Sequence, residues 1–128
     1  MIPFCIDQGI AVIPWSPLAR GRLTRDWDET STRQESDVFG STLYNATAES
    51  DKAIVAAVKK VAEERGVPRA QVALSWVAHR KGITAPIVGA SKPHHLDDAV
   101  AAIDLVLSPE ETATLEAAYG PHPVAGFE

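Results

Sequence analysis

Two short segments carry residues suited to binding phosphate groups. Residues 15–21 read Trp-Ser-Pro-Leu-Ala-Arg-Gly and combine a hydroxyl, several backbone N–H groups and a guanidinium directly after an apolar run. Arg22 and Arg25 add positive charge that could meet a pyrophosphate. Residues 89–93 read Gly-Ala-Ser-Lys-Pro and lead into an expected helix N-terminus, whose unpaired N–H groups and dipole favour an anion. Both segments are therefore candidate anion sites.

Each segment also has an interpretation without a ligand. A serine and a lysine before a helix, as at residues 91–92, are more often a cap with a solvated lysine. Trp15 is explained equally well as a core aromatic, and the arginines of residues 20–25 as a solubilising loop. Binding is favoured because each segment follows one of two apolar runs, and α/β folds place ligands at the carboxyl ends of buried strands.

The pattern around these segments predicts an α/β fold with parallel strands. Residues 10–15 and 83–88 are apolar runs without alternation, which is typical of strands covered on both faces. Residues 1–9 resemble the last turn of a helix that stops at Gly9, with Pro3 where the helix should run. Residues 22–49 are polar and irregular, which predicts a long loop, with a short helix inside it as an open alternative.

Four amphipathic helices complete the pattern. The first is capped by Ser50 and stops at Arg65-Gly66, and the second opens at Pro68 and ends at Lys81-Gly82. Their apolar faces are Ile54, Val55, Val58, Val61 and Ala62 in the first and Val72, Ala73, Trp76 and Val77 in the second. The third starts at Pro93 and carries the apolar residues Leu96, Val100 and Ile103. The fourth starts with the capping box of residues 108–111, Ser-Pro-Glu-Glu, and runs to Tyr119-Gly120.

Two strands do not cover a core, because their outer edges stay unpaired. The helices are amphipathic toward a surface that the chain does not itself supply. We therefore expect these 128 residues to form part of a larger parallel α/β barrel, as a fragment or as one contributor to an assembly.

Composition excludes several classes of function. The net charge of −5 argues against a nucleic-acid partner, and no apolar stretch approaches the length of a membrane span. The N-terminus lacks the pattern of a secretory signal, so a cytoplasmic protein is expected. Cys5 is the single cysteine, which excludes an internal disulfide, and it is expected as a small buried hydrophobe. His94 and His95 are neighbours that should not share a helix face, so no metal site is expected.

Both phosphate segments resemble signatures of the aldo-keto reductase superfamily. Residues 13–21 resemble its seventh-strand signature, most closely in the branch of bacterial general reductases and potassium-channel β-subunits. Residues 86–96 resemble the eighth-strand signature, and Tyr119 with the Pro-His-Pro tail matches the usual ending. The resemblance covers essentially the whole chain and implies the C-terminal part of a single (β/α)8 TIM barrel, residues 1–128, around strands 7 and 8. Such barrels typically have about 250 residues.

The resemblance implies NADP(H) as the cofactor and assigns residues to it. Trp15 matches the aromatic residue that stacks on the nicotinamide, and Lys92 favours NADP(H) over NAD(H) as a point charge. Ala99 stands where an asparagine commonly binds the adenine. The remaining assignments are Ser16, Pro17, Leu18, Ala19 and Arg20 around the pyrophosphate, Gly89 and Ser91 with Lys92 around the 2′-phosphate, His95 in place of a glutamine, and Asp98 on the adenine side.

The resemblance implies reduction of aldehydes and ketones, but the residues that carry out the family's proton transfer are not matched. That tyrosine, lysine, aspartate and histidine lie on the first strands of the barrel. Tyr44 and Tyr119 match neither motif nor position, and Lys59 and Lys60 lie on a solvated helical face. The chain alone is therefore expected to be inactive.

Three hypotheses remain open. The chain is part of an NADP(H)-dependent reductase that acts on small carbonyl substrates; or it is a non-catalytic nucleotide-binding remnant that pairs with another barrel portion or with itself; or it is a decayed remnant without a stable fold.

Overall fold

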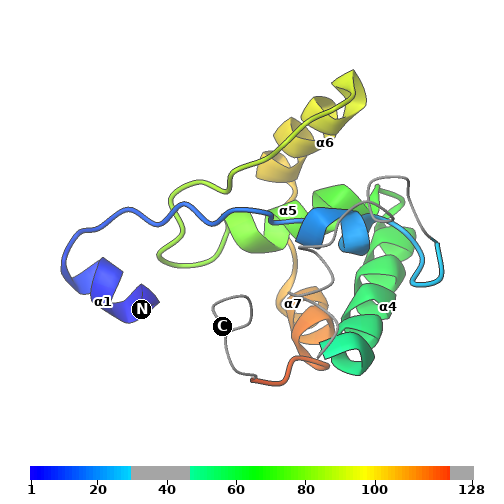
Figure 1. Cartoon of the computed structure of the whole chain (residues 1–128), viewed down its shortest axis with the longest axis horizontal. Coiled ribbons are helices and arrows are strands. Elements are labelled where there is room, and N and C mark those ends of the chain that lie inside the picture. Colours follow the sequence, from blue (N-terminus) through cyan, green and yellow to red (C-terminus); the bar gives the residue numbers. More distant parts are fainter. Residues whose placement is uncertain (30–46, 122–128) are drawn as a thin grey trace.

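A computed structural model describes residues 1–29 and 47–121, and the regular elements in that part of the chain are helical (Figure 1). They are α1 (Ile2–Asp7), the 3-10 helix η1 (Ala19–Thr24), α4 (Ala48–Arg65), α5 (Arg69–Ala78), α6 (Pro93–Asp104) and α7 (Pro109–Glu116). Helix α4 packs against α5 and α7, α6 packs against α5, and η1 contacts both α4 and α5. Within the described residues no helix is long and apolar enough to span a membrane.

The two expected strands lie side by side and run parallel, but they pair over a very short length. The structure has one isolated parallel bridge there, between Trp15 and Ile87. The Ile87 N–H donates to the Pro14 carbonyl at 2.8 Å, and the Thr84 N–H donates to the Val12 carbonyl at 2.8 Å. The direction of pairing was predicted correctly, whereas full strands over residues 10–15 and 83–88 were not found in the described chain.

The short pairing has identifiable physical causes. Pro14 and Pro86 have no N–H group to donate to a ladder. The Val12 N–H donates to the Thr84 side-chain oxygen at 3.1 Å instead of to a backbone carbonyl. Each segment also lacks a second neighbouring strand among the described residues, so only one edge of each is paired.

Several large apolar side chains of both extended segments are exposed, and none of the others is fully buried, contrary to the expectation of buried strands. More than half of the surface of Ile13, Trp15 and Ile87 is accessible, at 58%, 58% and 51%. The apolar residues predicted for the third helix, Leu96, Val100 and Ile103 of α6, are 57–63% exposed. The pattern was predicted correctly, but this chain does not supply the surface that would cover it.

The core of the described chain lies between α4, α5 and α7. Its buried cluster consists of Val58, Val61, Ala62, Val72 and Leu115. Val61 and Val72 are the most enclosed of these, with exposures of 1% and 0%. The amphipathic faces predicted for the first two long helices are therefore confirmed as packing faces.

Helix α4 begins earlier than predicted. Its N-cap is Thr47, and the Ser50 hydroxyl lies inside the first turn, where it donates to the Thr47 carbonyl at 2.9 Å. Ser50 is therefore not the cap. The predicted stop is confirmed: Gly66 has a left-handed φ of 66° and its N–H closes the helix.

Other boundaries also shift by a few residues. Helix α5 starts after Pro68, as predicted, but ends at Ala78, because the chain tightens into a turn before Gly82. Helix α7 ends at Glu116, short of Tyr119. Helix α1 holds its proline in the first turn, where proline is tolerated, and ends before Gly9.

The predicted loop over residues 22–49 is shorter than expected at both ends. Residues 22–24 belong to η1, so the start of the predicted loop is helical, in line with the alternative of a short helix. At the other end, α4 begins at Ala48. Residues 30–46 of this loop, and Tyr44 with them, lie outside the described residues. Cys5 is half-buried on α1 rather than enclosed.

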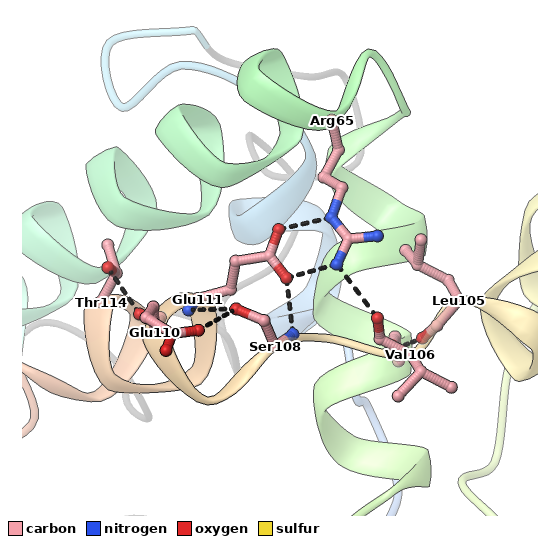
Figure 2. A network of polar contacts seen from close by, with 8 residues as sticks. Arg65, Leu105, Val106, Ser108, Glu110, Glu111 and Thr114 are labelled. Carbon is pink, nitrogen blue, oxygen red and sulfur yellow. Dashed lines mark hydrogen bonds and ion pairs between the residues drawn. The ribbon is translucent and has the colours of Figure 1, made fainter.

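A polar network joins α4 to the start of α7 (Figure 2). The Arg65 guanidinium donates to both carboxylate oxygens of Glu111 and, at 3.1 Å, to the Val106 carbonyl. Glu111 also accepts the Ser108 N–H at 2.7 Å, while the Ser108 hydroxyl accepts the Glu111 N–H at 3.2 Å. The predicted capping box is confirmed. The Arg65 guanidinium is the main cause that lowers the pKa of Glu111 from 4.5 to about 2.

We expect Glu111→Gln to destabilise the chain more at neutral pH than in acid. Glutamine retains the capping acceptor and loses the ion pair, so the expected loss is on the order of 1–2 kcal/mol at pH 7. Because folding lowers the pKa of Glu111, its contribution is present above pH 4.5 and is lost as the pH falls toward about 2. Urea unfolding at pH 7 and pH 2.5 measures the difference, with Glu63→Gln on the exposed face of α4 as control. An equal difference at both pH values would contradict this origin.

Candidate active site

The first phosphate segment is a tight bend in the backbone. Ser16, Ala19 and Arg20 have left-handed φ values of 53°, 48° and 57°, and Gly21 follows with 90°. Left-handed conformations cost a non-glycine residue on the order of 1 kcal/mol each. Ser16 supports the bend, because its carbonyl accepts the Ala19 N–H at 2.9 Å and its hydroxyl oxygen accepts the Arg20 N–H at 3.2 Å. Strain of this kind is typical of segments that present backbone groups to a ligand.

The two phosphate segments meet at two adjoining cavities. The first has a volume of about 320 Å³ and lies against Trp15, Ser16 and Arg20. The second has a volume of about 280 Å³ and extends past His95 and Asp98 of α6. Both are lined by Leu18, Val88 and Gly89, so they adjoin where the two segments come together. An added Cβ at Gly89 would meet nothing within 4 Å, so the space beside it is open.

Eight of the eleven cofactor residues predicted from the sequence line these two cavities. They are Trp15, Ser16, Pro17, Leu18, Arg20, Gly89, His95 and Asp98. Ala19 instead forms the first residue of η1. Ser91 and Lys92 lie exposed at the start of α6, outside the lining of either cavity.

The N-terminus of α6 is arranged around His95. Lys92 is the N-cap residue and is extended, with φ −139° and ψ 149°, and its side chain makes no capping hydrogen bond. The Ser91 N–H donates to Nδ1 of His95 at 3.4 Å. The His94 and His95 rings contact edge to face, with centroids 4.5 Å apart, although neighbours on a helix were not expected to meet. In residues 1–29 and 47–121 no group of three His, Cys, Asp or Glu could hold a metal.

Two residues beside the cavities were missed by the sequence interpretation. Gln71 of α5 donates through Nε2 to Asp98 at 2.9 Å and so ties α5 to α6. Arg69 lines the second cavity and forms an ion pair with Asp26. Lys59, expected on a solvated face, binds the same carboxylate at 3.0 Å. These partners are 27 to 43 residues apart, so no local pattern could have indicated them.

A third, larger cavity of about 550 Å³ lies between α4, α5 and α7. Glu116 forms an ion pair with Arg80 and accepts Nε1–H of Trp76 at 3.0 Å, and the Arg80 guanidinium stacks on Trp76 at 4.3 Å. Tyr119 also lines this cavity but is 65% exposed. Because Glu116 engages both Trp76 and Arg80, these contacts join α5 to α7.

A strained bend and a helix N-terminus each follow one of two parallel extended segments, which is the arrangement that α/β barrels commonly have where they bind phosphate. The model of the Aldo/keto reductase family matches residues 1–120, so the chain belongs to this family of oxidoreductases. The resemblance drawn from the two signatures is thereby confirmed.

Individual relatives agree with this assignment. Versiconal hemiacetal acetate reductase from Aspergillus parasiticus is 44% identical over 124 residues, which are 94% of this chain and 36% of that protein. The aldo-keto reductase dtxS3 from Metarhizium robertsii is 37% identical over 98% of this chain and 34% of its own length. The chain therefore spans about a third of the length of these relatives.

A solved structure shows the same fold. The glycerol dehydrogenase AKR11B4 from Gluconobacter oxydans aligns with a TM-score of 0.67 at 24% identity, over 97% of this chain and 39% of that chain. The predicted partial (β/α)8 barrel is confirmed, although the described residues are mostly helical and do not close a barrel.

Proposed function

We propose that this chain supplies the NADP(H)-binding part of an oxidoreductase that reduces aldehydes and ketones. The observation that carries the proposal is the pair of cavities joined at Leu18, Val88 and Gly89. Residues 15–20 and 89–98 line these two adjoining cavities. The family resemblance assigned both segments to the same cofactor. A dinucleotide needs adjoining space of this kind, with polar groups at separate points along it.

The residues divide along the cofactor by their chemistry. Trp15 offers an exposed aromatic face at one end, and Ser16 and Arg20 offer a hydroxyl and a guanidinium to the pyrophosphate. His95 and Asp98 lie on the adenine side. Lys92 stands at the α6 N-terminus, where its charge and the helix dipole both favour the 2′-phosphate. When bound, the cofactor supplies the hydride for the carbonyl carbon.

In this proposal, residues outside this chain carry out the proton transfer. Among the described candidates, Tyr119 is exposed beside a different cavity, and Lys59 is engaged with Asp26.

The exposed apolar side chains of Ile13, Ile87 and α6 then pack against the remaining portion of the barrel, which would be the partner of this chain. The name of the Aspergillus relative, a hemiacetal acetate reductase, supports a carbonyl-derived substrate. We place the intact enzyme in the cytoplasm.

NADPH titration with tryptophan emission as the signal tests the proposal. We expect NADPH to quench emission of the chain, and Trp15→Phe to remove most of the quenching, because Trp15 lines the cavity beside the phosphate segment. Trp76→Phe is the matched control, since Trp76 contacts Glu116 away from both cavities. Equal quenching in Trp15→Phe and in the unaltered chain, or none at millimolar NADPH, would contradict the site.

The same samples test inactivity. We expect no oxidation of NADPH with a small aldehyde above the buffer rate. Quenching without turnover is the combined result that the proposal requires.

A further inference from the structure

We infer that Asp26, Lys59 and Arg69 form a clasp that positions the phosphate segment for its ligand. We call these three residues the Asp26 clasp. The segment that the clasp positions is residues 16–24, which combine most of the first phosphate segment with η1. The inference rests on the proposed function in one respect: that this segment binds the cofactor phosphates. Asp26 and its two partners were assigned no role by the family signatures, and they act here through the segment rather than on the ligand.

The clasp joins the segment to two helices through one carboxylate. Asp26 follows η1 by two residues. Nζ of Lys59, on α4, donates to both carboxylate oxygens of Asp26, at 3.0 and 3.1 Å. Nη2 of Arg69, at the start of α5, donates to Oδ1 at 2.6 Å. Charge-assisted hydrogen bonds of this kind are stronger than neutral ones.

The segment needs external support because its own conformation is strained. It holds Ser16, Ala19 and Arg20 in the left-handed region, and the hydrogen bonds from Arg20 to Ser16 and from Thr24 to Gly21 lie within the segment itself. Leu23 packs against the core cluster. Asp26 then fixes the chain just after η1, through its pairs with Lys59 and Arg69.

The clasp also places a guanidinium beside the second cavity. Two cations share the Asp26 carboxylate, and the Glu29 carboxylate accepts the Asp26 N–H at 3.2 Å. Arg69 is only 18% exposed along its side chain and lines the second cavity with Gly89 and His95. Its Nη1 is buried and has no hydrogen-bond partner among the described residues. Hydrogen bonds from Lys59 and Arg69 lower the pKa of Asp26, so its carboxylate stays charged at a lower pH than a free aspartate would.

Limited digestion with trypsin measures the clasp directly. The bond after Arg22 lies inside η1 and is cut only when the segment opens. We expect Lys59→Met and Arg69→Met to speed cleavage of this bond roughly three- to tenfold, because each removes one partly exposed ion pair. Both substitutions leave the residues around the cleaved bond unchanged. Mass spectrometry identifies the fragments.

Controls separate positioning from general stability. Lys60→Met removes the neighbouring lysine, whose pair with Glu64 at 3.9 Å does not touch the segment, and should leave the rate unchanged. Lys59→Arg should restore the slow rate, because the cation is kept. Cleavage after Lys52 within α4 reports unfolding of the helices and should not change. NADPH affinity should weaken in Lys59→Met in proportion to the loss of the closed, binding-competent population.

The outcomes distinguish the clasp from the cofactor proposal. Cleavage after Arg22 at the same rate in Lys59→Met and Lys60→Met would overturn the clasp, even if NADPH binds. A rise at Arg22 and Lys52 together would overturn the positioning role, because the whole helical layer would then be opening. Faster cleavage at Arg22 alone in a chain that binds no NADPH would support the clasp and contradict the cofactor function.

Discussion

Replacing Val72 by aspartate is expected to abolish the cooperative unfolding transition of the chain. The Val72 side chain is 0% exposed and packs in the cluster that joins α4, α5 and α7. A carboxylate there has no cationic partner in the cluster, which costs on the order of 4 kcal/mol or more. A small domain has a total stability on the order of 5–15 kcal/mol, so most of it would be lost. Thermal unfolding followed by circular dichroism measures the effect.

Val100→Asp is the matched control, because Val100 of α6 is 57% exposed. Its expected effect on the free chain is within about 0.5 kcal/mol. A sharp transition in Val72→Asp close to that of the unaltered chain would contradict the core described here. An unaltered chain without any cooperative transition would favour the hypothesis of a decayed remnant.

The helix ends show which parts of the fold are encoded locally. The stop at Gly66 and the capping box of Ser108 and Glu111 were predicted correctly, because each depends on residues within four positions of one another. The start of α4 was misplaced, since Thr47 and Ser50 are both residue types that favour a helix cap, and residue type alone does not decide between them. Local signals identify that a helix ends, and less reliably which residue ends it.

The burial of α5 could not be read from one periodic stripe. The sequence pattern selected Val72, Ala73, Trp76 and Val77, of which the first two are buried. The structure also buries Leu74 and Ser75, and the Ser75 hydroxyl donates to the Leu105 carbonyl. Helix α5 lies between α4 and α6, so it is covered on more than one face. The extent of that coverage is a tertiary property.

The same division applies to the candidate site. Residues 15–21 and 89–93 were identified because strand, bend and helix start follow one another along the chain, which is a local pattern. Their meeting at Gly89 follows from the parallel pairing of the extended segments, and that was also expected. The Asp26 clasp was not, because an acidic residue in a polar loop has no preferred partner until α4 and α5 are in place.

Lys92→Ala is expected to weaken NADPH binding roughly tenfold while leaving NADH binding unchanged. Lys92 is exposed and lines neither cavity, so its contribution is that of a charge near the α6 N-terminus rather than of a packed contact. One charge-assisted contact at such a site is worth on the order of 1.4 kcal/mol, which corresponds to tenfold in affinity. Only the cofactor with a 2′-phosphate can lose this contact, so the two dissociation constants should respond differently. Fluorescence titration with both nucleotides measures them.

Lys92→Arg tests whether the charge or the particular side chain is required. Arginine keeps the positive charge and adds a planar fork that pairs with phosphate through two hydrogen bonds, so NADPH binding should be retained or strengthened. Equal loss of NADPH and NADH affinity in Lys92→Ala would show instead that the substitution disturbs the shared part of the site. That result would assign Lys92 to the turn before Pro93 and remove the argument for a preference between the two cofactors.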